Sequence, residues 1–369
     1  MVDAPDEAAR RSAVDEALAR AAGANGTLRF DRFLEVALYA PTIGYYAAQG
    51  RSLGSSGDFY TAAQVGPLLG ATLARRVRTE FDRLGQPASF RVIEAAAGDG
   101  SLATAVAGAM AEDPVLRTAA IEYVLVEPSP ALAHQLEQRL PQAARPPGLR
   151  WRWASAVAAD GPFAGLVLAN ELLDALPFRR LVFARGQWLE QGVRRSDGHW
   201  RLVDVGPADP VPAPGLPPSA EEGSVREVGV LAEGWVREVA DHLVRGAVIV
   251  LDYGDEEERL AARYPRGSLT AFRGHAVLED PFDAPGSADL SAFVNFTRIK
   301  SAATRAGLRI GSYGPQSEAL ARWGLGEVGP AWIQAAGGDA VERVRRQLTL
   351  KNLSFGFPNF RVLELTTGT

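Results

Sequence analysis

The sequence has 369 residues, which is enough for one large α/β domain with additions or for two smaller domains. The formal net charge is -5 and no dense run of Lys or Arg occurs, so the composition argues against a nucleic-acid-binding protein. The chain has no cysteine, which excludes disulfides and thiolate chemistry, and its 4 histidines lack the spacing of metal ligands, so we expect no metal.

The N-terminal region is predicted to be helical. A first helix is expected over 6–22, and its acidic residues fit neither a signal peptide nor a transit peptide. No stretch of the chain approaches the roughly 18 apolar residues of a membrane span, so we expect a cytoplasmic protein with no membrane partner. A second helix is predicted over 31–39, followed by a loop over 44–57 and a helix over 67–84. The apolar face of the second helix consists of Phe30, Phe33, Leu34, Ala37 and Leu38.

Strands and helices alternate from residue 90 onward. Strands are predicted over 90–94, 121–127, 149–153 and 166–169, with helices over 101–110 and up to residue 140. This alternation implies a parallel sheet with right-handed crossovers, so the fold class is α/β with a Rossmann-like sheet.

The alternation is then interrupted. Three strands meander through 178–205, with turns at Arg185-Gly186 and Asp197-Gly198. A helix is predicted over 225–244, and the core sheet resumes with a buried strand over 247–252 and a last strand over 360–365.

Glycines follow the first core strand, at Gly98 and Gly100, where bare backbone approaches a ligand at the carboxyl edge of the sheet. The segment also fits the dinucleotide pattern Gly-x-Gly-x-x-Ala, so a nicotinamide-dependent enzyme is an alternative. Glu127, at the end of the second strand, suits the ribose of either cofactor. Glu94 discriminates, because it would repel a pyrophosphate but attract the sulfonium and ammonium of S-adenosylmethionine. The pattern favours S-adenosylmethionine.

Polar residues also follow the fourth strand. Asn170, Glu171 and Asp174 stand beside an apolar strand end, where polar groups are costly unless they form bonds. We expect Asn170 to hold the cofactor or a substrate amine, and Glu171 or Asp174 to act as the general base. The alternative is an N-cap pair that starts a helix.

Several blocks together resemble the MidA family of S-adenosylmethionine-dependent methyltransferases, whose mitochondrial members are complex I assembly factors. The blocks are residues 33–39, 44–46, 57–62, 169–177, 251–254, 272–275 and 286–296, in the order of the family. The resemblance implies a class I methyltransferase fold with an N-terminal helical segment and an inserted subdomain. It also implies methylation of a protein or peptide side chain, which is an arginine nitrogen in the mitochondrial members.

On this resemblance, Tyr46, Asp58 and Thr61 bind the cofactor from a lid, and His275 is a third candidate catalytic residue on the acceptor side. We accordingly divide the chain into an N-terminal helical segment and lid (1–89), the cofactor-binding half of the core (90–177), an inserted subdomain (178–245), and the remaining core sheet with acceptor-side elements (246–369). A homodimer is possible on the same topology.

The sequence departs from the family pattern in three places. Ala95, Ala96 and Ala97 replace Leu-Gly-Pro in the loop, and Ala96 fits there if its φ is negative. Gln64 and Asn295 stand where the family tends to an acid. These amides favour an alternative function as a methyltransferase retargeted to a small-molecule or secondary-metabolite acceptor. A non-catalytic assembly protein that retains the fold is the remaining alternative.

Overall fold

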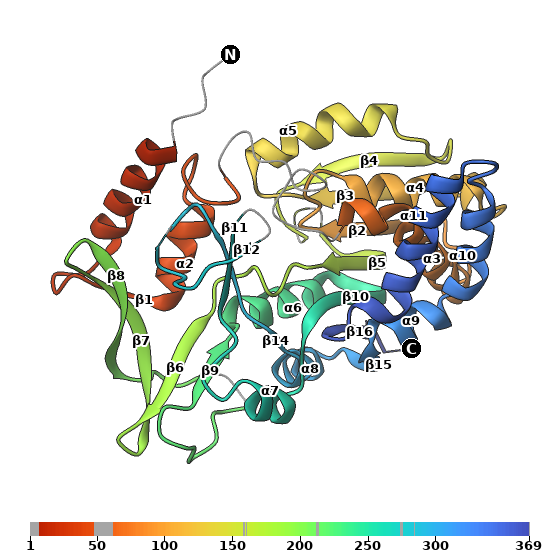
Figure 1. Cartoon of the computed structure of the whole chain (residues 1–369). Coiled ribbons are helices and arrows are strands. Elements are labelled where there is room, and N and C mark those ends of the chain that lie inside the picture. The colour runs from red at the N-terminus through yellow and green to blue at the C-terminus, as the bar shows by residue number, and fades with distance from the viewer. Residues whose placement is uncertain are drawn as a thin grey trace. The chain divides into compact units, whose positions relative to one another are not determined.

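The computed structural model describes residues 7–47, 62–157, 159, 161–211, 214–273, 276–283 and 285–368 (Figure 1). The chain divides into two compact units. The sheet unit comprises 52–172, 237–253 and 303–369, and the second unit comprises 1–51, 173–236 and 254–302. Across these described ranges, no helix is long and apolar enough to cross a membrane and no group of His, Asp or Glu side chains could hold a metal ion.

The sheet unit contains the predicted parallel sheet, in the strand order β15-β16-β10-β5-β2-β3-β4. Strands β4, β3, β2, β5 and β10 run parallel, and β16 is antiparallel to both of its neighbours. The bounds are β2 (Phe90–Ala95), β3 (Ile121–Val126), β4 (Leu149–Ala154), β5 (Phe163–Asn170), β10 (Leu243–Asp255), β15 (Arg309–Pro315) and β16 (Phe360–Thr366). The predicted α/β class is confirmed.

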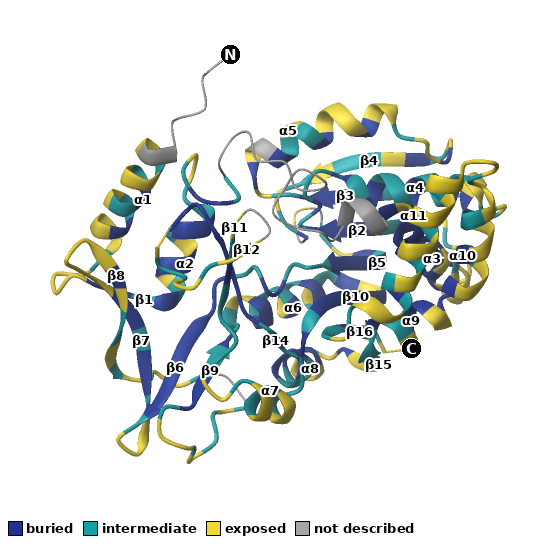
Figure 2. Ribbon diagram, in the orientation of Figure 1, coloured by how far each residue is buried: buried dark blue, intermediate teal, exposed yellow. Residues whose placement is uncertain are grey.

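Helices pack on this sheet through apolar faces. They are α3 (Ala62–Arg83), α4 (Ser101–Glu112), α5 (Pro130–Arg139), α9 (Gln316–Arg322), α10 (Leu325–Gln334) and α11 (Ala340–Lys351), with short 3-10 turns at Leu116–Thr118 and Leu140–Gln142 and a π turn at Asn352–Gly356. In α4 the buried positions recur at helical spacing, and β2, β5 and β10 are buried over most of their length (Figure 2). Helix α3 begins at Ala62, before the predicted start at Pro67, so Pro67 lies inside the helix, where it cannot donate a helical hydrogen bond.

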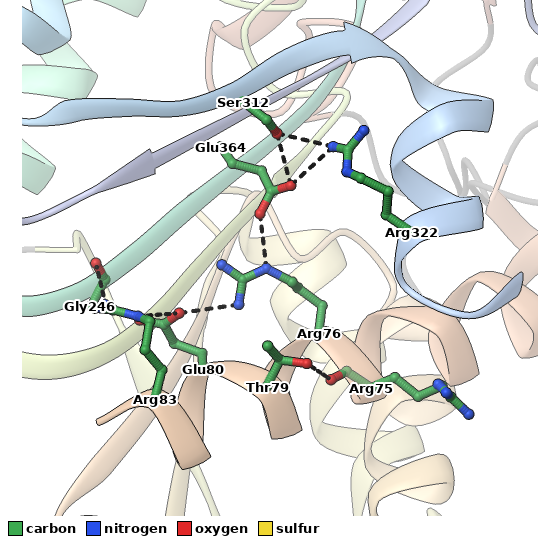
Figure 3. A network of polar contacts seen from close by, with 9 residues as sticks. All are labelled: Arg75, Arg76, Thr79, Glu80, Arg83, Gly246, Ser312, Arg322 and Glu364. Atoms are coloured by element: carbon green, nitrogen blue, oxygen red, sulfur yellow. Dashed lines mark hydrogen bonds and ion pairs between the residues drawn. The ribbon is translucent and has the colours of Figure 1, made fainter. Parts of the chain in front are cut away.

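A polar network fastens α3 to the sheet (Figure 3). Glu80 is fully buried and accepts hydrogen bonds from Arg76 and Arg83. Arg76 also donates to Glu364 on β16, over 2.9 Å, and Glu364 accepts further bonds from Ser312 and Arg322. Burial opposes ionisation of Glu364, but Arg76, Ser312 and Arg322 together outweigh it and lower the pKa of that carboxyl.

The second unit is built from antiparallel sheets and short helices. One sheet has the order β1-β7-β6-β9 with β8 paired to β7, and the other has the order β12-β11-β13. The strands are β1 (Thr27–Arg29), β6 (Arg179–Ala184), β7 (Gln187–Ser196), β8 (His199–Pro207), β9 (Val225–Val228), β11 (Thr270–Arg273), β12 (Ala276–Val277), β13 (Asp289–Ser291) and β14 (Val294–Asn295), which pairs with the end of β10. The helices that begin in this unit are α1 (Glu7–Ala21), α2 (Phe30–Tyr39), α6 (Val230–His242), α7 (Glu257–Arg263) and α8 (Phe296–Arg305).

Two predictions for the second unit are confirmed and one is wrong. All five residues of the predicted apolar face of α2 are buried. Both predicted turns of the meander occur, with positive φ at Arg185, Gly186, Asp197 and Gly198, as two-residue hairpin turns require. The helix expected from residue 225 begins only at Val230, because Val225–Val228 pairs with β6 as strand β9, with its two valines buried.

Candidate active site

The candidate site in the sheet unit lies at the carboxyl ends of β2, β3 and β5. In the parallel register, Glu94 of β2 stands beside Leu125 of β3 and Leu168 of β5. The residues that follow these strands therefore meet at one edge of the sheet, where ligands bind in open α/β sheets.

The turn after β2 has two glycines in the left-handed region of backbone conformation. Gly98 and Gly100 have φ of 56° and 76°, and a Cβ at Gly100 would lie 2.4 Å from Leu136 Cδ2 on α5. Asp99 Oδ1 then accepts the Ser101 N–H over 3.0 Å, at the start of α4. The turn thus presents bare backbone at Gly98, while Gly100 packs on a helix.

Ala96 does not meet the condition of a negative φ under which alanine fits the family loop. Its φ is 55°, in the left-handed region where a Cβ crowds the backbone, and the cost is about 1 kcal/mol. The surrounding contacts hold this conformation, because Gly98, two residues later, donates its N–H to Glu127.

Glu127 holds the turn and keeps acceptor capacity for a ligand. Its Oε2 accepts the Gly98 N–H and its Oε1 accepts the Ser129 N–H, each over 2.8 Å. Burial raises the pKa of Glu127 to about 7, although these two N–H groups counteract it. A carboxylate has roughly four acceptor positions, so about two remain for the hydroxyls of a ribose.

Glu94 lies beneath the turn and is buried. Its Oε2 accepts a hydrogen bond from the Tyr123 hydroxyl over 2.5 Å. Burial raises the pKa of Glu94 to about 8, with Asp99 and Glu127 adding to the increase against the Tyr123 bond. Glu94 is therefore largely protonated at neutral pH, and a nearby cation would favour its ionisation. Its predicted contact with the sulfonium and ammonium groups stays a prediction.

The residues after β5 also have an unusual backbone. Glu171 has φ of 52°, and its N–H donates to the Leu251 carbonyl over 2.9 Å. The Asn170 amide lies 3.4 Å from Glu171 Oε1. Non-glycine residues with positive φ are rare and concentrate at functional sites. The positive φ of Glu171 therefore supports Asn170 and Glu171 as candidate site residues.

A separate polar cluster lies in the second unit. Tyr46 donates to Asp289 Oδ1 over 2.7 Å, and Tyr39 donates to the Ala175 carbonyl over 2.8 Å. Burial raises the pKa of Tyr46, and the charges of Asp289 and of buried Asp174 raise it further. The structure thus brings Tyr46 and Asp174, predicted from blocks far apart in the sequence, within electrostatic reach of each other.

The amide at position 295 has a structural explanation. Asn295 donates through its side-chain nitrogen to Glu257, and its Oδ1 accepts the Arg298 N–H over 3.3 Å. Glu257 also accepts from Arg226, 2.5 Å away. An acid at position 295 would repel Glu257, so the amide suits its own surroundings.

Three predicted site residues, Asp58, Thr61 and His275, lie outside the described residues. Sequence reasoning also missed two described residues. The pattern around Tyr123 predicts only an apolar strand, although a tyrosine among aliphatic residues signals a buried hydroxyl that needs a partner. Asp289 lies in the block 286–296 that resembles the family, but the resemblance implies no role for it.

Comparisons with known proteins show what this chain is similar to. A family model of S-adenosyl-L-methionine-dependent methyltransferases matches residues 72–314. The Drosophila melanogaster protein named protein arginine methyltransferase NDUFAF7 homolog, mitochondrial, is 29% identical over 325 residues, covering 80% of this chain and 70% of its own length. Its counterpart in Danio rerio is 26% identical over 312 residues, covering 76% and 69%. A crystal structure from Burkholderia thailandensis with bound S-adenosyl-homocysteine is 31% identical, covers 99% of this chain and 95% of its own, and superposes with a TM-score of 0.85.

Proposed function

Because the chain belongs to the S-adenosyl-L-methionine-dependent methyltransferase family, we propose that it methylates a side-chain nitrogen of a protein, with arginine as the acceptor. The observation that carries the acceptor is the 29% identity, over 80% of this chain, with a relative named as a protein arginine methyltransferase. S-adenosylmethionine is the cofactor, and it supplies an electrophilic methyl group on a sulfonium. The class I fold expected from the sequence is the fold of this chain, as the similarity to the structure with bound S-adenosyl-homocysteine indicates.

The residues of the sheet unit fit this cofactor. The backbone at Gly98 and the unused acceptor positions of Glu127 would hold the nucleoside. Glu94 would ionise near a cation, and the hydrogen bond that it accepts from the Tyr123 hydroxyl favours the ionised form. Methyl transfer is an in-line displacement, so the main contribution of the chain is to align the reactants and exclude water.

A guanidinium acceptor needs carboxylates, both to attract its charge and to take a proton. Glu171 is our first candidate for this base, because its strained backbone holds it directly after β5. Asp174, with Asp289 and Tyr46, is the candidate set in the second unit. His275 remains a proposed acceptor-side residue.

One observation behind the small-molecule alternative has weakened. The amide at Asn295 favours a non-cationic acceptor only if position 295 faces that acceptor. Its hydrogen bond to Glu257 explains the amide without an acceptor. We therefore favour a protein acceptor. A cytoplasmic location and a homodimer also remain proposals, and the relatives named above are mitochondrial proteins.

The experiment is a transfer assay with methyl-tritiated S-adenosylmethionine and an extract of cells that lack this protein. We expect label in the protein fraction, recovered as methylarginine after acid hydrolysis. Label in the small-molecule filtrate would support the retargeted alternative, and no transfer despite cofactor binding would support the assembly protein.

The matching variant is Glu171→Gln, with Glu137→Gln as the control because its carboxylate lies on α5 with 65% of its side chain exposed. Glu171→Gln should lower turnover by about 100-fold or more while cofactor affinity changes little. Turnover equal to that of the control would remove Glu171 as base or anchor.

A further inference from the structure

Helix α5 contacts the glycine turn through two of its side chains. Arg139, in the last turn of α5, places its Nη2 3.0 Å from Asp99 Oδ2, and it also donates to the Ser101 hydroxyl. One turn earlier, Leu136 packs against Gly100 so closely that a Cβ at Gly100 would lie 2.4 Å from Leu136 Cδ2. An ion pair and an apolar contact from one helix therefore fix both sides of Gly100.

The turn is also held from its other side. Glu127 accepts the Gly98 N–H, and Ser129, which caps α5 through its contact with the Leu132 N–H, donates its own N–H to the same carboxylate. Both anchors of the turn thus come from α5 or from the segment that leads into it. The segment from Ala96 to Gly100 contains three residues with positive φ. Two are glycines, which adopt it readily, but at Ala96 it persists only where the surroundings fix it.

From these contacts we infer that Arg139 is a positioning residue for the cofactor loop. By holding Asp99 and Ser101, it keeps the backbone from Gly98 to Gly100 in the conformation that meets the cofactor. Arg139 does not touch the cofactor in this role; it acts through Asp99. None of the sequence motifs includes it, because it lies in the last turn of α5, outside the segments that carry those motifs.

A positioning role for Arg139 can be told apart from a contribution to stability, because an exposed ion pair changes the free energy of unfolding only slightly. The Arg139 side chain is 44% exposed, and ion pairs of that exposure change the free energy of unfolding by roughly 0–1 kcal/mol. Loss of Arg139 should therefore leave the protein folded. Its effect should appear in the strained turn, whose geometry determines cofactor binding.

The first measurement is the dissociation constant for S-adenosylhomocysteine, by calorimetric titration of the full chain. Arg139→Gln should weaken binding by about tenfold, within the range of couplings between members of one hydrogen-bond network. Arg139→Lys keeps the charge near Asp99 and should recover part of the loss. The control is Arg78→Gln, since Arg78 also bridges two carboxylates, Asp82 and Asp113, but away from the turn. Its affinity should equal that of the unmodified protein.

The link through Asp99 is tested by a double-variant cycle. If Arg139 acts through Asp99, then Arg139→Gln should cause no further loss once Asp99 is replaced, so the double variant Asp99→Asn/Arg139→Gln should bind with the same affinity as Asp99→Asn alone. Additive losses would contradict the link, and unchanged affinity in Arg139→Gln would overturn the inference.

The second measurement does not depend on the cofactor. Amide hydrogen exchange of the ligand-free protein should be faster at residues 98–101 in Arg139→Gln than in Arg78→Gln, with the same thermal midpoint in both. Equal exchange in this segment would also overturn the inference. Failure of the unmodified protein to bind S-adenosylhomocysteine would instead contradict the cofactor assignment, so the two results are distinguishable.

Discussion

Replacing Glu94 by glutamine should change how the stability of the protein depends on pH. The Glu94 carboxyl is 3% exposed and accepts a hydrogen bond from Tyr123, which a glutamine oxygen can also accept. A pKa of about 8, against 4.5 for an ordinary glutamate, corresponds to about 5 kcal/mol of preference for the protonated form in the folded state.

The sign of the effect follows from the direction of the pKa change. The folded state binds the Glu94 proton more tightly than the unfolded state, so this contribution is fully present below pH 4.5 and is lost as pH rises through about 8. The unmodified protein should therefore lose stability between pH 5 and 9 relative to Glu94→Gln. The difference between the two proteins should approach about 5 kcal/mol at the alkaline end.

The assay is urea denaturation of both proteins at several pH values. The free energies of unfolding are compared where the two proteins show the same dependence on urea concentration. The exposed Glu137→Gln serves as the control and should follow the unmodified protein throughout. Parallel pH profiles for the unmodified protein and Glu94→Gln would refute the reasoning, because they would mean that Glu94 does not carry a proton in the folded state at neutral pH.

Three further predictions concern the same unit. Ala96→Gly should stabilise the protein by about 0.5–1 kcal/mol, since glycine relieves the positive φ; a lower thermal midpoint would contradict this. Glu80→Gln should destabilise it by about 3 kcal/mol, because it breaks a fully buried ion pair with Arg76, whereas an effect below about 0.5 kcal/mol in denaturant titration would show that the network contributes little. Glu127→Gln should weaken binding of S-adenosylhomocysteine by about tenfold and abolish the gain in affinity expected in the unmodified protein as pH rises through about 7; calorimetry at pH 6 and 8 checks both effects.

Local patterns predicted the parallel sheet of the sheet unit and the hairpins of the second unit. The alternation of short apolar strands with helices identified the parallel sheet, and turn residues identified the hairpins of β6, β7 and β8. Short segments that contain a strand end, a glycine turn and a following carboxylate were enough to propose Gly98, Gly100 and Glu127 as site residues. The structure brings Gly98 and Glu127 into a hydrogen bond, and their contact with the cofactor stays a prediction.

What could not be predicted depends on contacts between distant residues. The strand at Val225–Val228 exists because β6 lies beside it, more than 40 residues away in the sequence. The positive φ of Ala96 is imposed by neighbouring contacts against the preference of alanine. Likewise, the role of Asn295 depends on Glu257, 38 residues earlier, and the ion pair of Arg76 joins residues 288 apart.

The central claim is that the edge formed by Gly98, Gly100 and Glu127 binds S-adenosylmethionine. Calorimetric titration of the purified protein with S-adenosylhomocysteine, and separately with NADH, tests it most directly. We expect saturable binding of S-adenosylhomocysteine, weakened in Glu127→Gln, and no binding of NADH. Binding of NADH alone, or of neither ligand, would contradict the account.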